Sequence, residues 1–339
     1  MRDLNVTEDD HGRRIDRVLR KAFPGVPPGA IAGAIRRGQV RINGKRCRNN
    51  SRVQSGDTLR VPPWDPGTHA GSAEDPRQGA PEARLEHRSI TSGPWHVPIL
   101  ERTRDYLALN KPPGLTVHGK NSLEEIVLAV ARREHWYRES LSFTPGPVHR
   151  LDRNTSGVQL FALSTTGAQE LSRDLADRQV LKLYLALLEG VLPEPLEIRQ
   201  SLVYDRDRRV ARVSTDPDQA LPARTRVTPL LVERSGRHTL AAAIPATGRT
   251  HQIRCHCSAA GFPLRGDRKY GGSGTAPYLL HNLVFALSRS GRFWNGPLPA
   301  EWSEKLAADY SGYTGLPGRI EELLQTTCTT DVSLGTIRV

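Results

Sequence analysis

The side chains best suited to chemistry lie in the string HRLDRNTSG, which runs from His149 to Gly157. Its one carboxylate, Asp152, stands between two cations, Arg150 and Arg153. Neighbouring cations favour the ionised form of a carboxylate, which can then act as a nucleophile or a base. A loop aspartate that caps a nearby amide or forms a surface ion pair is the competing interpretation, and this string by itself favours it.

A second segment combines an aromatic ring with a cation. In the string KLYLALLEG, Lys182 and Tyr184 alternate with leucines, so a strand places the two on one face. An aromatic ring beside a cation suits stacking on a nucleic-acid base near a phosphate. A half-buried strand tyrosine is the commoner explanation of such a residue.

The third segment, TGRTHQIRCH from Thr247 to His256, is predicted to begin a helix. With Thr250 as its N-cap, Arg254 lies one turn later, and His251 takes the adjacent face. Arg249 and Arg254 then project from the start of the helix, where an anion binds well. Two ordinary surface arginines are the alternative.

The charge balance predicts a polyanionic partner. The formal net charge is +12, and residues 1–61 hold 14 Arg or Lys against 6 Asp or Glu, an excess of +8. Phosphates attract clustered cations without any sequence-specific contact. No run approaches the roughly 20 apolar residues that cross a bilayer, and residues 1–10 lack the apolar core of a signal peptide. We therefore expect a cytoplasmic protein with no membrane association.

The cysteines indicate neither disulfides nor metal. They are too few and too irregularly spaced for a disulfide framework in a chain of 339 residues. In CHC, at residues 255–257, the two cysteines are too close for zinc, whose paired ligands are separated by about two to four residues. We expect reduced thiols and no zinc site; the cysteines are Cys47, Cys255, Cys257 and Cys328.

The elements that position these residues divide the chain into two bodies. Apolar residues recur at helical steps from Arg14 to Phe23, and a second short helix follows Pro27 and Pro28. Strand signals at 40–42 and 58–61, with a turn at 43–44, complete a compact α/β module at residues 12–61. Its candidate contacts to a polyanion are Arg36, Arg37 and Arg41.

Residues 62–96, rich in Pro, Gly and Ser, are predicted to form a flexible linker. In residues 97–310, strand-like runs at 106–109, 158–163, 183–188 and 238–243 intermix with helices at 123–134 and 166–175. This mixture predicts a mixed α+β domain. A Thr166 to Gln169 capping box opens the second helix. Residues 311–339, with one helical signal at 320–324, are expected to form a peripheral tail.

Taken together, the three segments resemble the successive signatures of RluA-like pseudouridine synthases. LALNKPPGLTVH upstream and LLHNLVFAL downstream are similar to further signatures of that family. Residues 12–61 look like the S4 RNA-binding domain that many members acting on large-subunit rRNA carry, and the layout is most similar to the RluC type. The resemblance covers residues 12–61 and 97–300, and implies a mixed, mainly antiparallel catalytic sheet.

The resemblance also implies the chemistry. Family members convert selected uridines in RNA to pseudouridine without a cofactor or metal. By similarity, Asp152 is the catalytic carboxylate, acting on the ribose or the base, Tyr184 stacks on the target uracil, and Arg254 pairs with the carboxylate. The implied RNA contacts of the catalytic domain are Arg150, Arg153, Lys182, Arg249 and His251.

Two other functions stay open at this point. A non-catalytic RNA-binding or ribosome-assembly factor keeps the fold for binding alone, and Asp152 discriminates it from an enzyme. The same chemistry on tRNA or another RNA is the second. The S4-like module favours 23S rRNA, free or in an assembly particle, as the partner of a monomeric enzyme.

Overall fold

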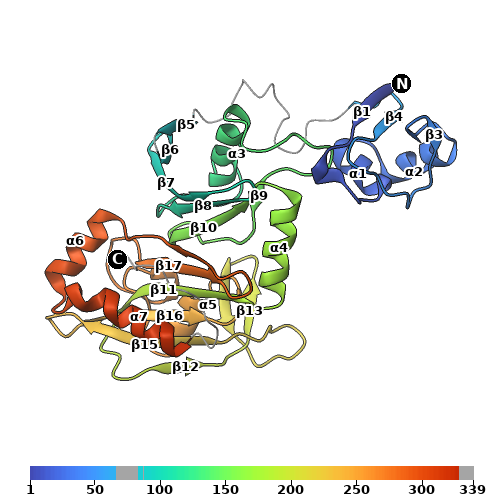
Figure 1. The fold of residues 1–339 in the computed structure, drawn as a ribbon. Helices are drawn as coiled ribbons and strands as arrows, with labels where there is room; N and C mark the ends of the chain where they lie inside the picture. The colour runs from blue at the N-terminus through green and yellow to red at the C-terminus, as the bar shows by residue number, and fades with distance from the viewer. Residues whose placement is uncertain (66–82, 87, 328–339) are drawn as a thin grey trace.

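The structure is a computed structural model that describes residues 1–65, 83–86 and 88–327. A small N-terminal module, blue in Figure 1, stands beside a larger domain built on one long sheet. Parts of the predicted linker and tail, and Cys328, lie outside the described residues. No helix in the described ranges is long and apolar enough to cross a membrane.

The N-terminal module pairs two helices with a small sheet, as its pattern predicts. Helices α1 (Ile15–Ala22) and α2 (Pro28–Arg36) bury their apolar positions in one shared core. The strand order is β1-β4-β2-β3, with β1 at Arg2–Asn5, β4 at Thr58–Val61, β2 at Arg41–Ile42 and β3 at Lys45–Arg46. Because β1 pairs with β4, this sheet begins ahead of residue 12.

The larger domain has a long, mainly antiparallel sheet, which confirms the predicted fold class. Its strand order is β12 (Leu196–Ile198), β15 (Thr225–Val232), β16 (His238–Pro245), β11 (Val180–Glu189), β17 (Leu280–Leu287), β10 (Ser156–Ala162), β8 (Tyr106–Lys111), β7 (Trp95–Arg102), β6 (Ser89–Ser92) and β5 (Ala83–Glu86). Strands β10 and β17 run parallel, with Ser156 opposite His281 and Gly157 opposite Asn282. Strand β9 (Gly146–Pro147) pairs antiparallel with β10, and β18 (Arg292–Asn295) pairs antiparallel with β17. Strands β13 (Leu202–Asp205) and β14 (Val210–Val213) form a separate hairpin.

The helices cover the sheet in separate places (Figure 1). Helix α3 (Leu123–Arg133) packs on the β5–β6 end, α4 (Thr165–Ala176) on β10, and α5 (Gln252–Ala259) on β14 to β16. On β11, Leu183, Leu185 and Leu187 share a core with α6 (Ala300–Asp309) and α7 (Leu316–Thr327). Tyr184 points to the opposite face, as the alternation predicts.

Two boundaries differ from the expectations. Strands β5, β6 and the start of β7 lie within the range expected to be a linker, because Ile90 and Val97 are fully buried beneath α3. Helix α7 lies within the range expected to be a peripheral tail, yet Leu316, Ile320 and Leu324 are fully buried. Their helical spacing gives α7 an apolar face that packs against the central strands.

Two helix starts also differ. The hydroxyl of Ser164, rather than Thr166, caps α4 by accepting a hydrogen bond from the Gly167 amide at 3.0 Å. Helix α5 begins at Gln252, with His251 as its N-cap at φ 55°, so Thr250 is not the cap. The side chain of Gln252 accepts hydrogen bonds from the Thr247 hydroxyl and the Arg249 amide. These bonds hold residues 247–251 in a loop, so the helix begins at Gln252.

Hydrogen bonds attach the N-terminal module to the larger domain. The buried carboxylate of Asp10 accepts from the Leu141 amide at 3.1 Å and the Ser142 hydroxyl at 2.6 Å. The Thr165 amide, at the start of α4, donates to the side chain of Asp9 at 2.6 Å. The linker is therefore not the sole connection between the two bodies.

Candidate active site

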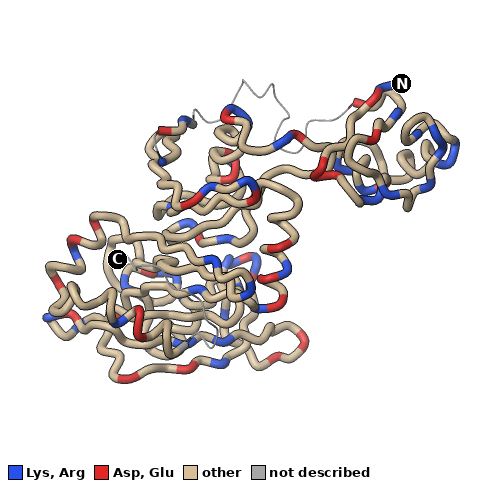
Figure 2. The backbone as a smooth tube through the Cα atoms, in the orientation of Figure 1, with Lys and Arg blue, Asp and Glu red and all other residues tan. Residues whose placement is uncertain are grey.

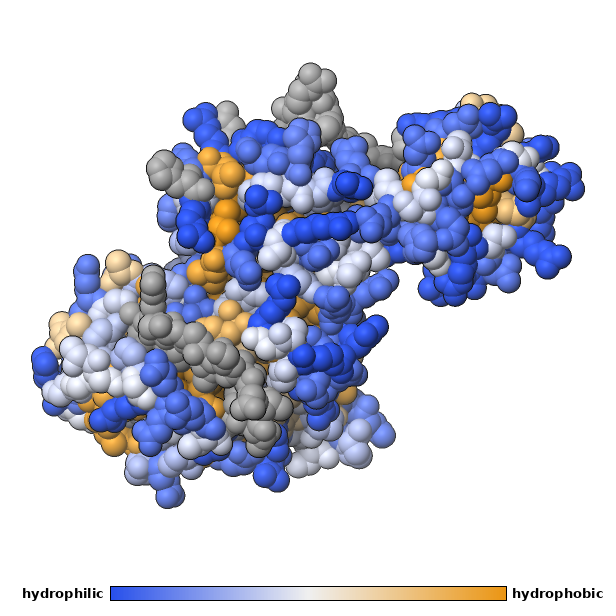
Figure 3. All heavy atoms as spheres, viewed as in Figure 1, coloured by the Kyte–Doolittle hydropathy of each residue, from blue (hydrophilic) through white to orange (hydrophobic). Residues whose placement is uncertain are grey.

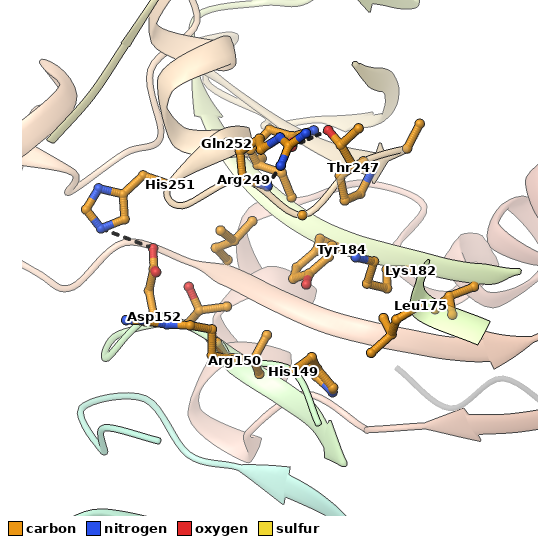
Figure 4. A pocket seen from close by; sticks show the side chains of 18 of the residues that line it. His149, Arg150, Asp152, Leu175, Lys182, Tyr184, Thr247, Arg249, His251 and Gln252 are labelled. Atoms are coloured by element: carbon orange, nitrogen blue, oxygen red, sulfur yellow. Dashed lines mark hydrogen bonds and ion pairs between the residues drawn. The ribbon is translucent and has the colours of Figure 1, made fainter. Parts of the chain in front are cut away.

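A cleft of 440 Å³ lies on the Tyr184 face of the central sheet. Its volume falls in the range of about 300–1,000 Å³ that is usual for small-ligand sites. Residues 148–152, ahead of β10, form one wall, and residues 245–254, the loop into α5, form another. Figure 4 shows that side chains of Asp152, Tyr184 and Arg249 come together here from separate segments.

Most of the site residues predicted from the sequence line this cleft: Arg150, Asp152, Lys182, Tyr184, Arg249, His251 and Arg254. Arg153 is not among the lining residues; it is exposed, and its Nε donates to the Gly114 carbonyl at 2.9 Å. The other three predicted contacts lie in the N-terminal module and are exposed: Arg36 ends α2, Arg37 follows it, and Arg41 begins β2.

The loop that carries Asp152 is anchored from several sides. The Asp152 carbonyl accepts a hydrogen bond from the Thr155 amide at 3.1 Å. The buried amine of Lys111 donates to the Arg153 carbonyl at 3.0 Å. On the other side, the Gln159 amide group donates to the His149 carbonyl at 2.6 Å. These bonds hold the backbone of the carboxylate in place before a ligand arrives.

Both partners of the Asp152 carboxylate approach the same oxygen. Nη1 of Arg254 lies 3.0 Å from Oδ2. Nε2 of His251 lies 3.6 Å from the same oxygen, the contact that is dashed in Figure 4. Among the described residues, none makes a hydrogen bond to Oδ1. The carboxylate is therefore held through one oxygen, while the other is available to a substrate.

The guanidinium of Arg254 is fully engaged. Its Nε and Nη2 donate to the two oxygens of Asp267 at 2.6 and 2.8 Å. Its Cζ lies 4.9 Å from the ring centroid of Tyr270 and 4.6 Å from that of Tyr278, so both rings make cation–π contacts. Burial opposes the charge, but the hydrogen bonds to Asp267 and the attraction of Asp152 outweigh it and raise the pKa of Arg254.

Sequence reasoning missed Lys111, Asp267, Tyr270 and Tyr278. The one local signal for Asp267 is its place in the string RGDRKYGG, where a lone acidic residue follows glycine in a tight turn. Its partner is 13 residues away in the chain and belongs to another element, so the string does not disclose the pairing.

Burial sets the protonation of three other side chains in the cleft. It lowers the pKa of His251, against the attraction of Asp152, so the imidazole is neutral at pH 7. It lowers the pKa of Lys182, whose amine forms no hydrogen bond or ion pair with any described residue. It raises the pKa of Tyr184, whose hydroxyl therefore stays protonated at neutral pH.

The family model for RNA pseudouridylate synthase matches residues 105–259, and that for the S4 domain matches residues 13–59. Ribosomal large subunit pseudouridine synthase C of Haemophilus influenzae is 34% identical over 272 residues, which cover 79% of this chain and 78% of the relative. The chain belongs to the RNA pseudouridylate synthase family. It is an isomerase that acts on RNA, and the predicted resemblance is confirmed.

One further relative and two solved structures are also similar to this chain. The synthase C of Escherichia coli is 34% identical over 270 residues, 78% of each chain. The structure titled Human RNA Pseudouridylate Synthase Domain Containing 1 has a TM-score of 0.56 at 24% identity, covering 69% of this chain and 95% of that one. The structure of Human RNA Pseudouridylate Synthase Domain Containing 4 has a TM-score of 0.53 at 23% identity, and the match covers 62% of this chain and 91% of that one. These two structures share the fold.

Proposed function

We propose that this pseudouridine synthase modifies uridines of large-subunit ribosomal RNA, with Asp152 as the attacking carboxylate. The observation that carries the proposal is the state of that side chain, bound through Oδ2 and open at Oδ1 in a cleft that fits a nucleotide base. The proposed substrate is inferred from the relatives, since those from Haemophilus influenzae and Escherichia coli are named for the large ribosomal subunit.

The proposed reaction begins when the target uridine leaves its stack and enters the cleft, at a cost of a few kcal/mol that loops and bulges reduce. The ring of Tyr184 supports the base. Oδ1 of Asp152 attacks either ribose C1′ or uracil C6. The bond from N1 to C1′ breaks, and the base turns. A bond from C5 to C1′ forms, and the bond between Oδ1 of Asp152 and the substrate breaks, which returns the free carboxylate. The C5 proton leaves to solvent, and N1 takes up a proton.

The surrounding side chains hold these steps in place. Arg254 fixes Oδ2, which leaves the geometry of attack to Oδ1 alone. His251, neutral through burial, adds bulk beside the carboxylate without a second full charge. Lys182, Arg249 and Arg150 line the cleft and are proposed to contact the phosphates or carbonyls of the flipped nucleotide.

We further propose that residues 1–61 supply affinity and residues 97–300 supply chemistry. A groove of 1110 Å³ runs where α1 of the module meets Gln169 of α4, and its cations are Arg13, Arg14, Arg17, Arg20, Lys21 and Arg52. Figure 2 shows Lys and Arg gathered on the module, and Figure 3 shows its visible face as mainly hydrophilic. Such a surface suits an RNA backbone that spans both bodies.

The Asp152→Asn variant tests the chemistry, because the amide keeps the shape and loses the nucleophile. Large-subunit rRNA carrying 5-tritiated uridine releases tritium when C5 bonds to C1′. We expect tritium release by the wild type and none by the variant, with RNA affinity within about threefold of wild type. Equal release by the variant refutes the assignment, and release from tRNA alone refutes the substrate.

Charge substitution tests the role of the module better than deletion, because deletion also removes the contacts of Asp9 and Asp10 with the larger domain. Replacing Arg36, Arg37 and Arg41 with Gln should weaken RNA binding. It should also reduce the slope of the logarithm of the binding constant against the logarithm of salt concentration by about 2, since each phosphate contact adds about 0.7–0.9. An unchanged slope would count against the proposal. The matched control removes three exposed cations of the larger domain: Arg234, Arg289 and Lys305.

The monomeric state, the cytoplasmic location and the choice between free rRNA and an assembly particle stay predictions. Mapping pseudouridines across total RNA from a strain without this protein identifies the modified sites. Repeating the assay with free rRNA and with isolated precursor particles separates the two forms of substrate.

A further inference from the structure

The guanidinium of Arg254 stands between two carboxylates and binds them unequally. Asp267 receives two hydrogen bonds, from Nε and Nη2, whereas Asp152 receives one, from Nη1. Only 2% of the Asp267 side chain and 7% of the Arg254 side chain are exposed, so solvent does not compete for these bonds. A guanidinium binds a carboxylate best through two parallel hydrogen bonds. Arg254 forms this pair of bonds with Asp267, which lies outside the cleft, and not with Asp152.

The Asp267 backbone is held in a rigid loop. Its amide donates to the Leu264 carbonyl at 3.0 Å, and its own carbonyl accepts from the Gly272 amide at 2.9 Å. A Cβ on Gly272 would lie 1.9 Å from the Leu264 carbonyl oxygen, and Gly266 adopts φ +85°. The loop therefore closes so tightly that the Asp267 carboxylate has a fixed position relative to α5.

We propose that Asp267 is a positioning residue for pseudouridine formation. By occupying the paired edge of the Arg254 guanidinium, it leaves Nη1 as the donor that reaches Asp152, and thereby keeps Oδ1 of Asp152 free to attack. Without Asp267, Arg254 is able to turn its paired edge to both oxygens of Asp152 and occupy the attacking atom. This inference rests on the proposed catalytic role of Asp152.

Two substitutions of Asp267 test whether it orients the Arg254 guanidinium relative to Asp152. Asp267→Asn keeps the shape but leaves one acceptor for two donors, and Asp267→Glu keeps the charge but displaces both oxygens by a methylene. For both we expect kcat for tritium release from large-subunit rRNA to fall at least about tenfold, with KM within about threefold, because misplacement by about 1 Å costs that much or more. Wild-type kcat in either variant would overturn the proposal.

A matched control separates positioning from general stability. Asp16 also receives two bonds from one arginine, Arg14, at 3.1 and 3.0 Å, in the N-terminal module. Asp16→Asn should lower the thermal midpoint and leave kcat unchanged. If Asp267→Asn does not fold, the Glu variant alone decides, because it keeps the buried charge pair.

A double-mutant cycle identifies the route of the effect. A lysine ammonium lacks the two parallel N–H donors with which the Arg254 guanidinium binds Asp267. Asp267→Asn in the Arg254→Lys background should therefore change kcat by less than about threefold. The same tenfold loss in both backgrounds would show a role independent of Arg254 and overturn the proposal. Failure of the proposed function is distinct, since an active Asp152→Asn would refute it whatever Asp267 does.

Discussion

Replacing Lys111 with Met tests how the loop of Asp152 is held. Lys111 is fully buried, and its amine donates to the carbonyls of Pro112 at 2.9 Å and Arg153 at 3.0 Å. Burial lowers its pKa to about 7, although the attraction of Asp152 opposes the shift. Methionine has a similar length but donates no hydrogen bond, so the loop loses this attachment.

The sign of the pH effect follows from the lowered pKa of Lys111. An unfolded lysine has a pKa near 10.4, so between pH 7 and 10 the unfolded state binds more protons than the folded state. The free energy of unfolding therefore rises with pH in this window, by about 2 kcal/mol between pH 7 and pH 9 from this group alone. Lys111→Met loses this contribution, together with two hydrogen bonds worth about 1–3 kcal/mol each if their carbonyls stay unpaired.

Urea unfolding of both proteins at pH 7, 8 and 9 measures the effect. We expect the deficit of Lys111→Met to be about 2 kcal/mol larger at pH 9 than at pH 7. We also expect tritium release to slow about tenfold or more, because the Arg153 carbonyl adjoins Asp152. Lys305→Met, at an exposed lysine, is the control. An equal deficit at pH 7 and pH 9 would refute the reasoning.

Three further changes test the site and its frame. Gly157→Ala places a Cβ 2.2 Å from the Asn282 carbonyl oxygen, so we expect thermal unfolding to show a destabilisation of about 3 kcal/mol or more. The control is Gly119→Ala, at a glycine with a similar φ but open space around it, for which we expect about 1 kcal/mol. Burial lowers the pKa of His281 to about 4, so the unfolded histidine takes up a proton first as pH falls. This group alone should lower the free energy of unfolding by about 2 kcal/mol between pH 7 and pH 5, and in urea titrations His281→Gln should lessen the measured drop by about that amount. Tyr184→Phe should keep KM within threefold, whereas Tyr184→Leu should raise it about tenfold, since stacking on a base is worth about 1–3 kcal/mol; equal KM values would contradict the stacking role.

Local patterns were sufficient for much of this protein. The alternation in β11 predicted that Tyr184 and Lys182 leave the leucine face, and the basic helices of the module followed from spacing alone. Asp152 lies between two arginines, a setting that by itself favoured a loop or surface role, and the joint order of three segments indicated the family and with it the catalytic role. Each helix, strand or single-segment signal lies within about ten consecutive residues, over which the periods of helices and strands operate, whereas the family signal comes from the order of segments between residues 149 and 256.

Tertiary structure decided which of these residues work together. Arg254 binds both Asp152, 102 residues away, and Asp267, 13 residues away, and this arrangement depends on where α5 and a tight loop meet the sheet. The strands in the expected linker and the buried face of α7 likewise depend on distant surfaces that they cover. A local pattern shows which face of an element is apolar, but the sheet register and the closure of loops determine which partner that face meets.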